Sequence, residues 1–224
     1  MKSINTLTTE ISGIQMKSLY LHFKTIRINE SIQRINKLRF RKPATPKAII
    51  AKGEILYDVI DAITLFENYH SLCDDVLQSK TLGPSLPEKL VKYLKLTRKK
   101  MAQWKHVRNN LGGHLNLDVI RGICEFHNYR GVFVSNHLEA DFKGVLLNMM
   151  LGKAVNETMS KSKLFVKEID LTNPGDLNEF ITLFMADWRI TLDLFSKLNE
   201  FLYKIGRKEK MGTMFAGDIG IIKF

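Results

Sequence analysis

The chain has 224 residues, of which 45% are hydrophobic and 25% are charged, and a formal net charge of +11. This apolar fraction supports a packed core, and the absence of fixed-period repeats and low-complexity tracts excludes solenoid and disordered classes. No apolar run reaches the roughly 18 residues of a membrane span, no leader-like segment opens the chain, and two cysteines give no disulfide framework. We therefore expect a cytoplasmic protein without membrane contact.

Two segments hold most of the positive charge. Residues 1–50 contain ten Lys or Arg against two Glu, and residues 86–110 contain eight Lys or Arg against one Glu. Clustered cations suit a polyanion-binding surface, because neutralised phosphates release their condensed counterions. A solvated helix face has the same composition, so charge alone leaves both interpretations open.

Apolar residues at three- and four-residue steps predict two long helices in the first third of the chain. Residues 4–40 form the first, interrupted only by Gly13 and ended by residues 42–46. Its expected inward stripe is Leu7, Ile11, Ile14, Leu19, Phe23, Ile28, Ile32, Ile35 and Leu38. The second begins at Lys47 and turns Leu56, Val59, Ile63, Phe66, Tyr69, Cys73 and Val76 inward.

A turn at residues 81–85 leads to a third helix, with Pro87 in its first turn and Gly112-Gly113 at its end. Its inward face consists of Leu90, Leu94, Thr97, Met101 and Trp104. Its outward face consists of Lys92, Lys95, Lys99 and Lys100, which with Lys105 are the candidate RNA-binding residues.

The second half of the chain predicts shorter elements and one long helix. Residues 117–127 suggest a short helix, Leu138 to Met149 another, and residues 130–135 and 164–169 could add one small strand pair. Asn173 caps a last helix that Gly206 closes, with the stripe Leu177, Ile181, Phe184, Trp188, Thr191, Phe195, Leu198 and Leu202. The predicted fold is mainly α, a multi-helix bundle in one domain over residues 1–206, followed by a tail at 207–224.

Several common catalytic and cofactor motifs are absent from the sequence. There is no H-E-x-x-H, paired Cys-x-x-Cys, Walker loop or G-x-S-x-G. Cys124 and His127 make at most half a metal site, and the neighbouring carboxylates Asp74 and Asp75 point about 100° apart on a helix. We expect neither a metal nor a cofactor.

The segment from Trp104 to Leu115 resembles the signature of HEPN domains, which are helical RNA-cleaving or nucleotide-associated modules. In that family an Arg, usually followed by a polar residue, precedes a His by a few positions near the junction of two helices. Arg108, Asn109 and His114 match this pattern. The resemblance implies a HEPN-like core at about 47–160 with flanking helices at 4–40 and 174–205. It also implies a homodimer with a shared site, acting as a toxin or antiviral component.

The chemistry of these three residues suits RNA cleavage. Histidine exchanges protons near neutral pH, and arginine presents a permanently charged planar fork to phosphate oxygens. Arg108, Asn109 and His114 are therefore the candidate catalytic residues of a metal-independent endoribonuclease. In a regular helix, six residues would place His114 about 120° around and 9 Å along from Arg108, so the Gly-Gly break or a second subunit must bring the groups together.

Two other interpretations remain open. Arg108 and Asn109 could instead satisfy carbonyls at a helix end, with His114 as a capping or surface residue. The protein would then be a non-catalytic helical adaptor, or an RNA- or nucleotide-binding protein that uses its basic face. The expected partners are RNA, a second copy of the chain, and an antitoxin or regulatory protein.

Overall fold

The computed structural model describes residues 2–37, 46–112, 121–122, 124–125, 147–156, 164–171 and 173–208. Their main elements are α1 (Lys2–Lys37), α2 (Pro46–Gln78), the short 3-10 helix η1 (Gly83–Ser85), α3 (Glu88–Gly112), α6 (Leu147–Asn156) and α7 (Pro174–Lys208). No strand occurs among these residues. The predicted mainly α bundle is confirmed.

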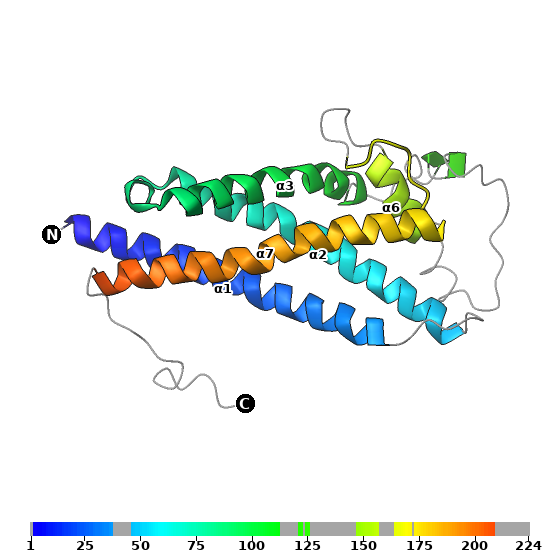
Figure 1. The fold of residues 1–224 in the computed structure, drawn as a ribbon, viewed down its shortest axis with the longest axis horizontal. Coiled ribbons are helices and arrows are strands. Elements are labelled where there is room, and N and C mark those ends of the chain that lie inside the picture. Colours follow the sequence, from blue (N-terminus) through cyan, green and yellow to red (C-terminus); the bar gives the residue numbers. More distant parts are fainter. Residues whose placement is uncertain are drawn as a thin grey trace.

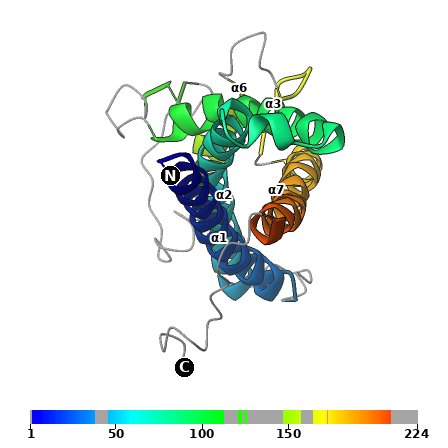
Figure 2. The same cartoon turned by 90° about the vertical axis from the view of Figure 1, so that its left-hand side faces the viewer.

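Four long helices form the bundle. Helix α1 packs on α2 and α7, and α3 also packs on α2 and α7, so α1 and α3 occupy diagonal positions (Figure 2). The short helix α6 packs on α2 and α3 at the end of the bundle where α3 finishes (Figure 1). The outward faces of α1 and α3 therefore point to different sides of the molecule.

The centre of the bundle is aromatic. Trp104 of α3 lies edge-on to Phe184 of α7, with 5.8 Å between ring centroids, and Phe66 of α2 contacts both rings. The sets predicted to face inward from α2 and α3 are all buried. Periodicity located this part of the core correctly, because each helix turns one continuous stripe toward the centre.

Helix α1 departs from its prediction. It runs through Gly13 without a break, and Phe23, expected inside, is 68% exposed. Ser18 and Thr25 are buried instead, where the Thr25 hydroxyl donates to the Leu21 carbonyl at 2.8 Å and bonds the Tyr69 hydroxyl. Small hydroxyl residues can occupy an inward face when such partners satisfy them.

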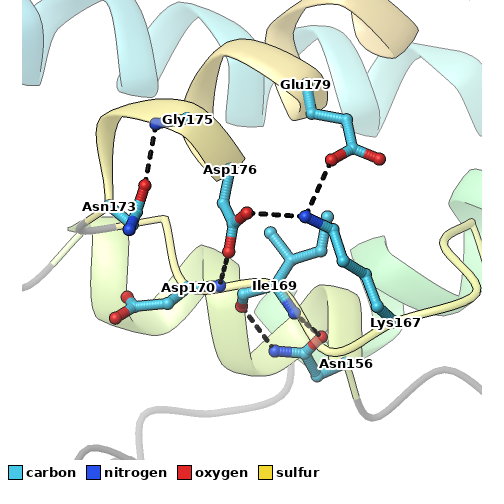
Figure 3. Close-up of polar contacts among 8 residues, drawn as sticks. All are labelled: Asn156, Lys167, Ile169, Asp170, Asn173, Gly175, Asp176 and Glu179. Carbon is cyan, nitrogen blue, oxygen red and sulfur yellow. Dashed lines mark hydrogen bonds and ion pairs between the residues drawn. The ribbon is translucent and has the colours of Figure 1, made fainter.

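Residues 164–169 are irregular, so the predicted strand there is wrong. The side-chain amide of Asn156 takes the place of a partner strand (Figure 3): its Nδ2 donates to the Ile169 carbonyl at 2.7 Å, and its Oδ1 accepts the Ile169 N–H at 2.9 Å. Lys167 then reaches Asp176 at 2.8 Å and Glu179 at 3.0 Å. These contacts fix the segment to α6 and to the first turns of α7.

Helix α7 begins as predicted and ends later than predicted. The Asn173 side chain caps it by accepting the Gly175 N–H at 2.8 Å (Figure 3), but the helix continues past Gly206 to Lys208. Asp176 sits in the first turn, where the helix dipole favours its charge.

Other predictions fall partly or wholly outside the described residues. Arg121, Gly122, Cys124 and Glu125 are helical, in agreement with the short helix expected at 117–127. The strand at 130–135, the stripe from Leu138 to Leu146 and residues 209–224 of the tail lie outside. In the described helices, no segment has the length and apolarity required to cross a membrane.

Candidate functional site

Helix α3 positions most of the candidate residues. Lys92, Lys95 and Lys99 are exposed along its outer face, as predicted. Lys92 pairs with Glu88 one turn earlier at 2.6 Å, but both side chains are at least 75% exposed, so the pair is weak. Lys95 and Lys99 make no ion pair within the part of the chain that the structure describes. These three lysines form the α3 lysine row.

Lys100 does not belong to this row. Its Nζ lies 3.6 Å from Oδ1 of Asp187 on α7, and Asp187 is 2% exposed. The other oxygen of that carboxylate, Oδ2, accepts the Trp104 Nε1–H at 2.9 Å. A buried carboxylate needs both a donor and a compensating charge, so Lys100 acts in the α3–α7 interface.

Arg108 is held in a defined orientation near the end of α3. Its Nη1 forms an ion pair with Oε2 of Glu67 on α2 at 2.9 Å and donates to Oδ1 of Asn109 at 3.0 Å. Its Nε and Nη2 make no hydrogen bond to the described residues, and the side chain is 38% exposed. The Nε–Nη2 edge is one of the two edges through which a guanidinium binds a phosphate with two parallel hydrogen bonds.

Two neighbours complete the end of α3. Lys105 places Nζ 4.0 Å from Oε1 of Glu67, so this carboxylate faces two cations. Asn110 donates from Nδ2 to the Ala154 carbonyl at 3.2 Å, which ties the last turn of α3 to α6. The cluster of Glu67, Lys105, Arg108 and Asn109 is therefore anchored on both sides.

Of the predicted catalytic residues, Arg108 and Asn109 are in contact, and His114 lies outside the described residues. Helix α3 extends to Gly112, in agreement with the predicted end at the Gly-Gly pair. Glu67 was missed as a site residue, because it lies on a different helix from the Arg108 motif. Its role depends on tertiary packing, and no local pattern in the sequence signals it.

Asp74, Asp75 and Cys73 are paired or buried. Asp74 contacts Arg98 at 2.7 Å, whereas Asp75 pairs with Lys17, so the two neighbouring carboxylates serve different partners. Burial raises the pKa of Cys73 to about 12, which leaves an unreactive thiol. Within the described ranges, no three His, Cys, Asp or Glu side chains gather as a metal site would require.

Comparison of the chain with known protein families, curated proteins and solved structures finds no match. A function must therefore be inferred from the residues of α2 and α3 themselves.

Proposed function

We propose that this protein is a metal-independent endoribonuclease of HEPN type, with Arg108, Asn109 and His114 at its active site. The observation that carries the proposal is the state of Arg108. Glu67 and Asn109 hold one nitrogen of its guanidinium and leave the Nε–Nη2 edge without a partner among the described residues. An arginine oriented in this way can receive a phosphate without reorganising, which is the arrangement that stabilises developing charge most effectively.

Each residue has a distinct part in the proposed reaction. His114 takes the proton of the RNA 2′-hydroxyl, whose oxygen attacks the adjacent phosphorus. Arg108 stabilises the negative charge on the pentacoordinate phosphate, and Asn109 keeps its fork in place. The 5′-oxygen departs with a proton from water, leaving a 2′,3′-cyclic phosphate.

The α3 lysine row supports RNA as the substrate. Lys95 and Lys99 lie on the same helix as Arg108, and neither is neutralised by a described carboxylate. Nine residues separate Lys99 from Arg108, which puts the two side chains about 180° apart around α3. A bound strand would therefore pass around the end of the helix to contact both. Phosphate contacts of this kind bind single strands without reading their sequence. We therefore propose a sequence-tolerant nuclease.

The alternative is a non-catalytic adaptor that uses the same row. It is favoured by the ion pair with Glu67, because that carboxylate partly neutralises Arg108. The two functions differ in one respect: an adaptor binds RNA and leaves it intact.

The test is cleavage of a labelled single-stranded RNA by the purified protein in the presence of a chelator. Arg108→Ala and His114→Ala should each lose about a hundredfold or more in rate, and the double variant should be little worse, because both act on one transition state. Arg98→Ala is the matched control, since Arg98 is also on α3 and paired with an α2 carboxylate.

Three outcomes would contradict the proposal. Cleavage that requires added Mg²⁺ would show that the mechanism depends on a metal. Full activity of Arg108→Ala would show that Arg108 has no part in catalysis. RNA binding without cleavage by the unmodified chain would favour the adaptor.

A further inference from the structure

The outward face of α1 carries an unusual set of residues. Thr9, Gly13, Met16, Tyr20, Phe23 and Arg27 recur at alternating steps of four and three residues, and all six are exposed. We call these six residues the α1 row. Met16 and Phe23 are each 68% exposed and Tyr20 is 57% exposed. The row spans roughly 27 Å at 1.5 Å per residue.

The composition of the α1 row is that of a protein interface. Aromatic residues, Met and Arg are enriched in the buried centres of interfaces, whereas Lys, Glu and Asp are depleted there. Large apolar side chains that follow one helix face at a three- and four-residue spacing also fit the packing of a second helix.

The spacing of the α1 row is symmetric about the level of residue 18. Met16 and Tyr20 each lie two residues from that level, on opposite sides of it. Gly13 and Phe23 each lie five residues from it, and Thr9 and Arg27 each lie nine residues from it. A two-fold axis at this level would place each residue of the row opposite its counterpart in an antiparallel second copy. The bulky half of one row would then face the small half of the other.

Gly13 leaves space on the surface of α1 for a side chain of the second copy. A Cβ added at Gly13 would meet nothing within 4 Å, so packing within the chain does not require a glycine there. Gly13 also lines an open groove of about 1070 Å³ between α1 and the end of α2. In the antiparallel arrangement, the Phe23 ring of the second copy enters at this glycine.

Charges on the flank of α1 complement one another in the same arrangement. Glu10 and Lys24 both line grooves on the side of α1 that faces α2. They lie eight and six residues from the level of residue 18, on opposite sides of it. Each Lys24 would therefore approach the Glu10 of the other copy, the kind of flanking pair that sets helix orientation.

We propose that the α1 row is the interface of an antiparallel homodimer with its two-fold axis level with residue 18. Tyr20 and Phe23 offer on the order of 250 Å² of surface per copy, and even with the rest of the α1 row the interface stays below the roughly 800 Å² per partner of a standard interface. The dimer should therefore dissociate on dilution.

This interface does not depend on the proposed ribonuclease. It does change one expectation, because the resemblance implied a site shared between subunits. Arg108 lies on the helix diagonal to α1 (Figure 2), so the two Arg108 sites of this dimer are separated by both bundles. A site shared between subunits would then require a second interface.

Sedimentation velocity over a range of concentrations tests the interface. The unmodified chain should pass from 25.8 kDa to twice that mass as its concentration rises. Phe23→Asp should weaken dimerisation at least tenfold by placing a charge in the interface, and Gly13→Trp should do so by blocking the position that Phe23 enters. Tyr203→Asp is the control, because Tyr203 is 62% exposed but lies on α7.

Charge reversal tests the register without relying on a disruptive variant. Lys24→Glu and Glu10→Lys should each weaken the dimer, and the two together should restore it. Three results would overturn the proposal: a monomer at every concentration, a dimer that Phe23→Asp and Gly13→Trp leave unchanged, or an effect of Phe23→Asp on RNA binding with none on mass. Circular dichroism of each variant verifies its fold.

Discussion

Helices α1 and α3 are diagonal partners in one bundle, yet they distribute their side chains in opposite ways. Helix α3 buries Trp104 and exposes the lysine row, whereas α1 buries the hydroxyls of Ser18 and Thr25 and exposes Tyr20 and Phe23. An aromatic residue contributes to the stability of the fold only where the core can surround it. Exposed aromatics on α1 are therefore available for contacts with another molecule.

The largest expected effect separates a buried aromatic ring from an exposed one. Trp104→Ala should lower the free energy of unfolding by about 3 to 5 kcal/mol, because it leaves a cavity and removes the donor to Asp187. Phe23→Ala should change it by less than about 0.5 kcal/mol at concentrations where the chain is monomeric. Urea denaturation of both variants measures the difference. Equal losses would mean that Phe23 belongs to the core after all.

A smaller effect concerns the hydroxyl contact beneath α1. Burial raises the pKa of Tyr69 to about 12, from about 10 in an unfolded chain. Because the folded-state pKa is the higher one, the stability from keeping Tyr69 neutral is complete below pH 10. It is lost as the pH rises to 12, by roughly 2 to 3 kcal/mol. Between pH 10 and 12 the free energy of unfolding should fall less steeply for Tyr69→Phe than for the unmodified chain. Parallel curves for the two proteins would mean that Tyr69 ionises freely in the fold.

The smallest effect concerns the outer face of α3. Replacing Lys92, Lys95 and Lys99 with Gln should reduce the salt dependence of single-stranded RNA binding by about 2 in logarithmic slope, if each lysine neutralises one phosphate. Lys100 is left in place, because it compensates Asp187. Lys197→Gln with Lys204→Gln on α7 is the control, since both lysines are already paired with carboxylates. An unchanged slope in the α3 variant would mean that the α3 lysine row does not contact RNA and is only a solvated helix face.

Sequence periodicity was sufficient where large apolar residues recur along most of an inward stripe. It predicted the inner faces of α2 and α3 correctly, but on α1 it selected Leu19 and Phe23 over Ser18 and Thr25. Apolar side chains occur on more than one face of α1, so their spacing did not reveal that Thr25 lies inside, where Leu21 and Tyr69 satisfy its hydroxyl. The strand at 164–169 was predicted from β-propensity, but the backbone there bonds the side chain of Asn156 and not a second strand.

The candidate site was predictable only in part. Arg108, Asn109 and the lysine row follow from residue type and position along a single helix. Glu67 pairs with Arg108 across 41 positions of the sequence, and Asp187 pairs with Lys100 across 87. Contacts of that range depend on how the helices pack, so the sequence could not distinguish Lys100 from its exposed neighbours.

The contact between α1 and α7 has a consequence for the order of folding. Asn199 of α7 and Ser18 of α1 are in contact although 181 positions separate them, and Figure 1 shows the C-terminal half of α7 beside the N-terminal half of α1. In contrast, α2 and α3 are joined by the short connection between Gln78 and Glu88. Closing the longer loop costs roughly 2 to 3 kcal/mol more in chain entropy. The α2–α3 hairpin, which carries the Glu67–Arg108 pair, can therefore assemble early. The Glu67–Arg108 pair can then form before α1 and α7 come into contact.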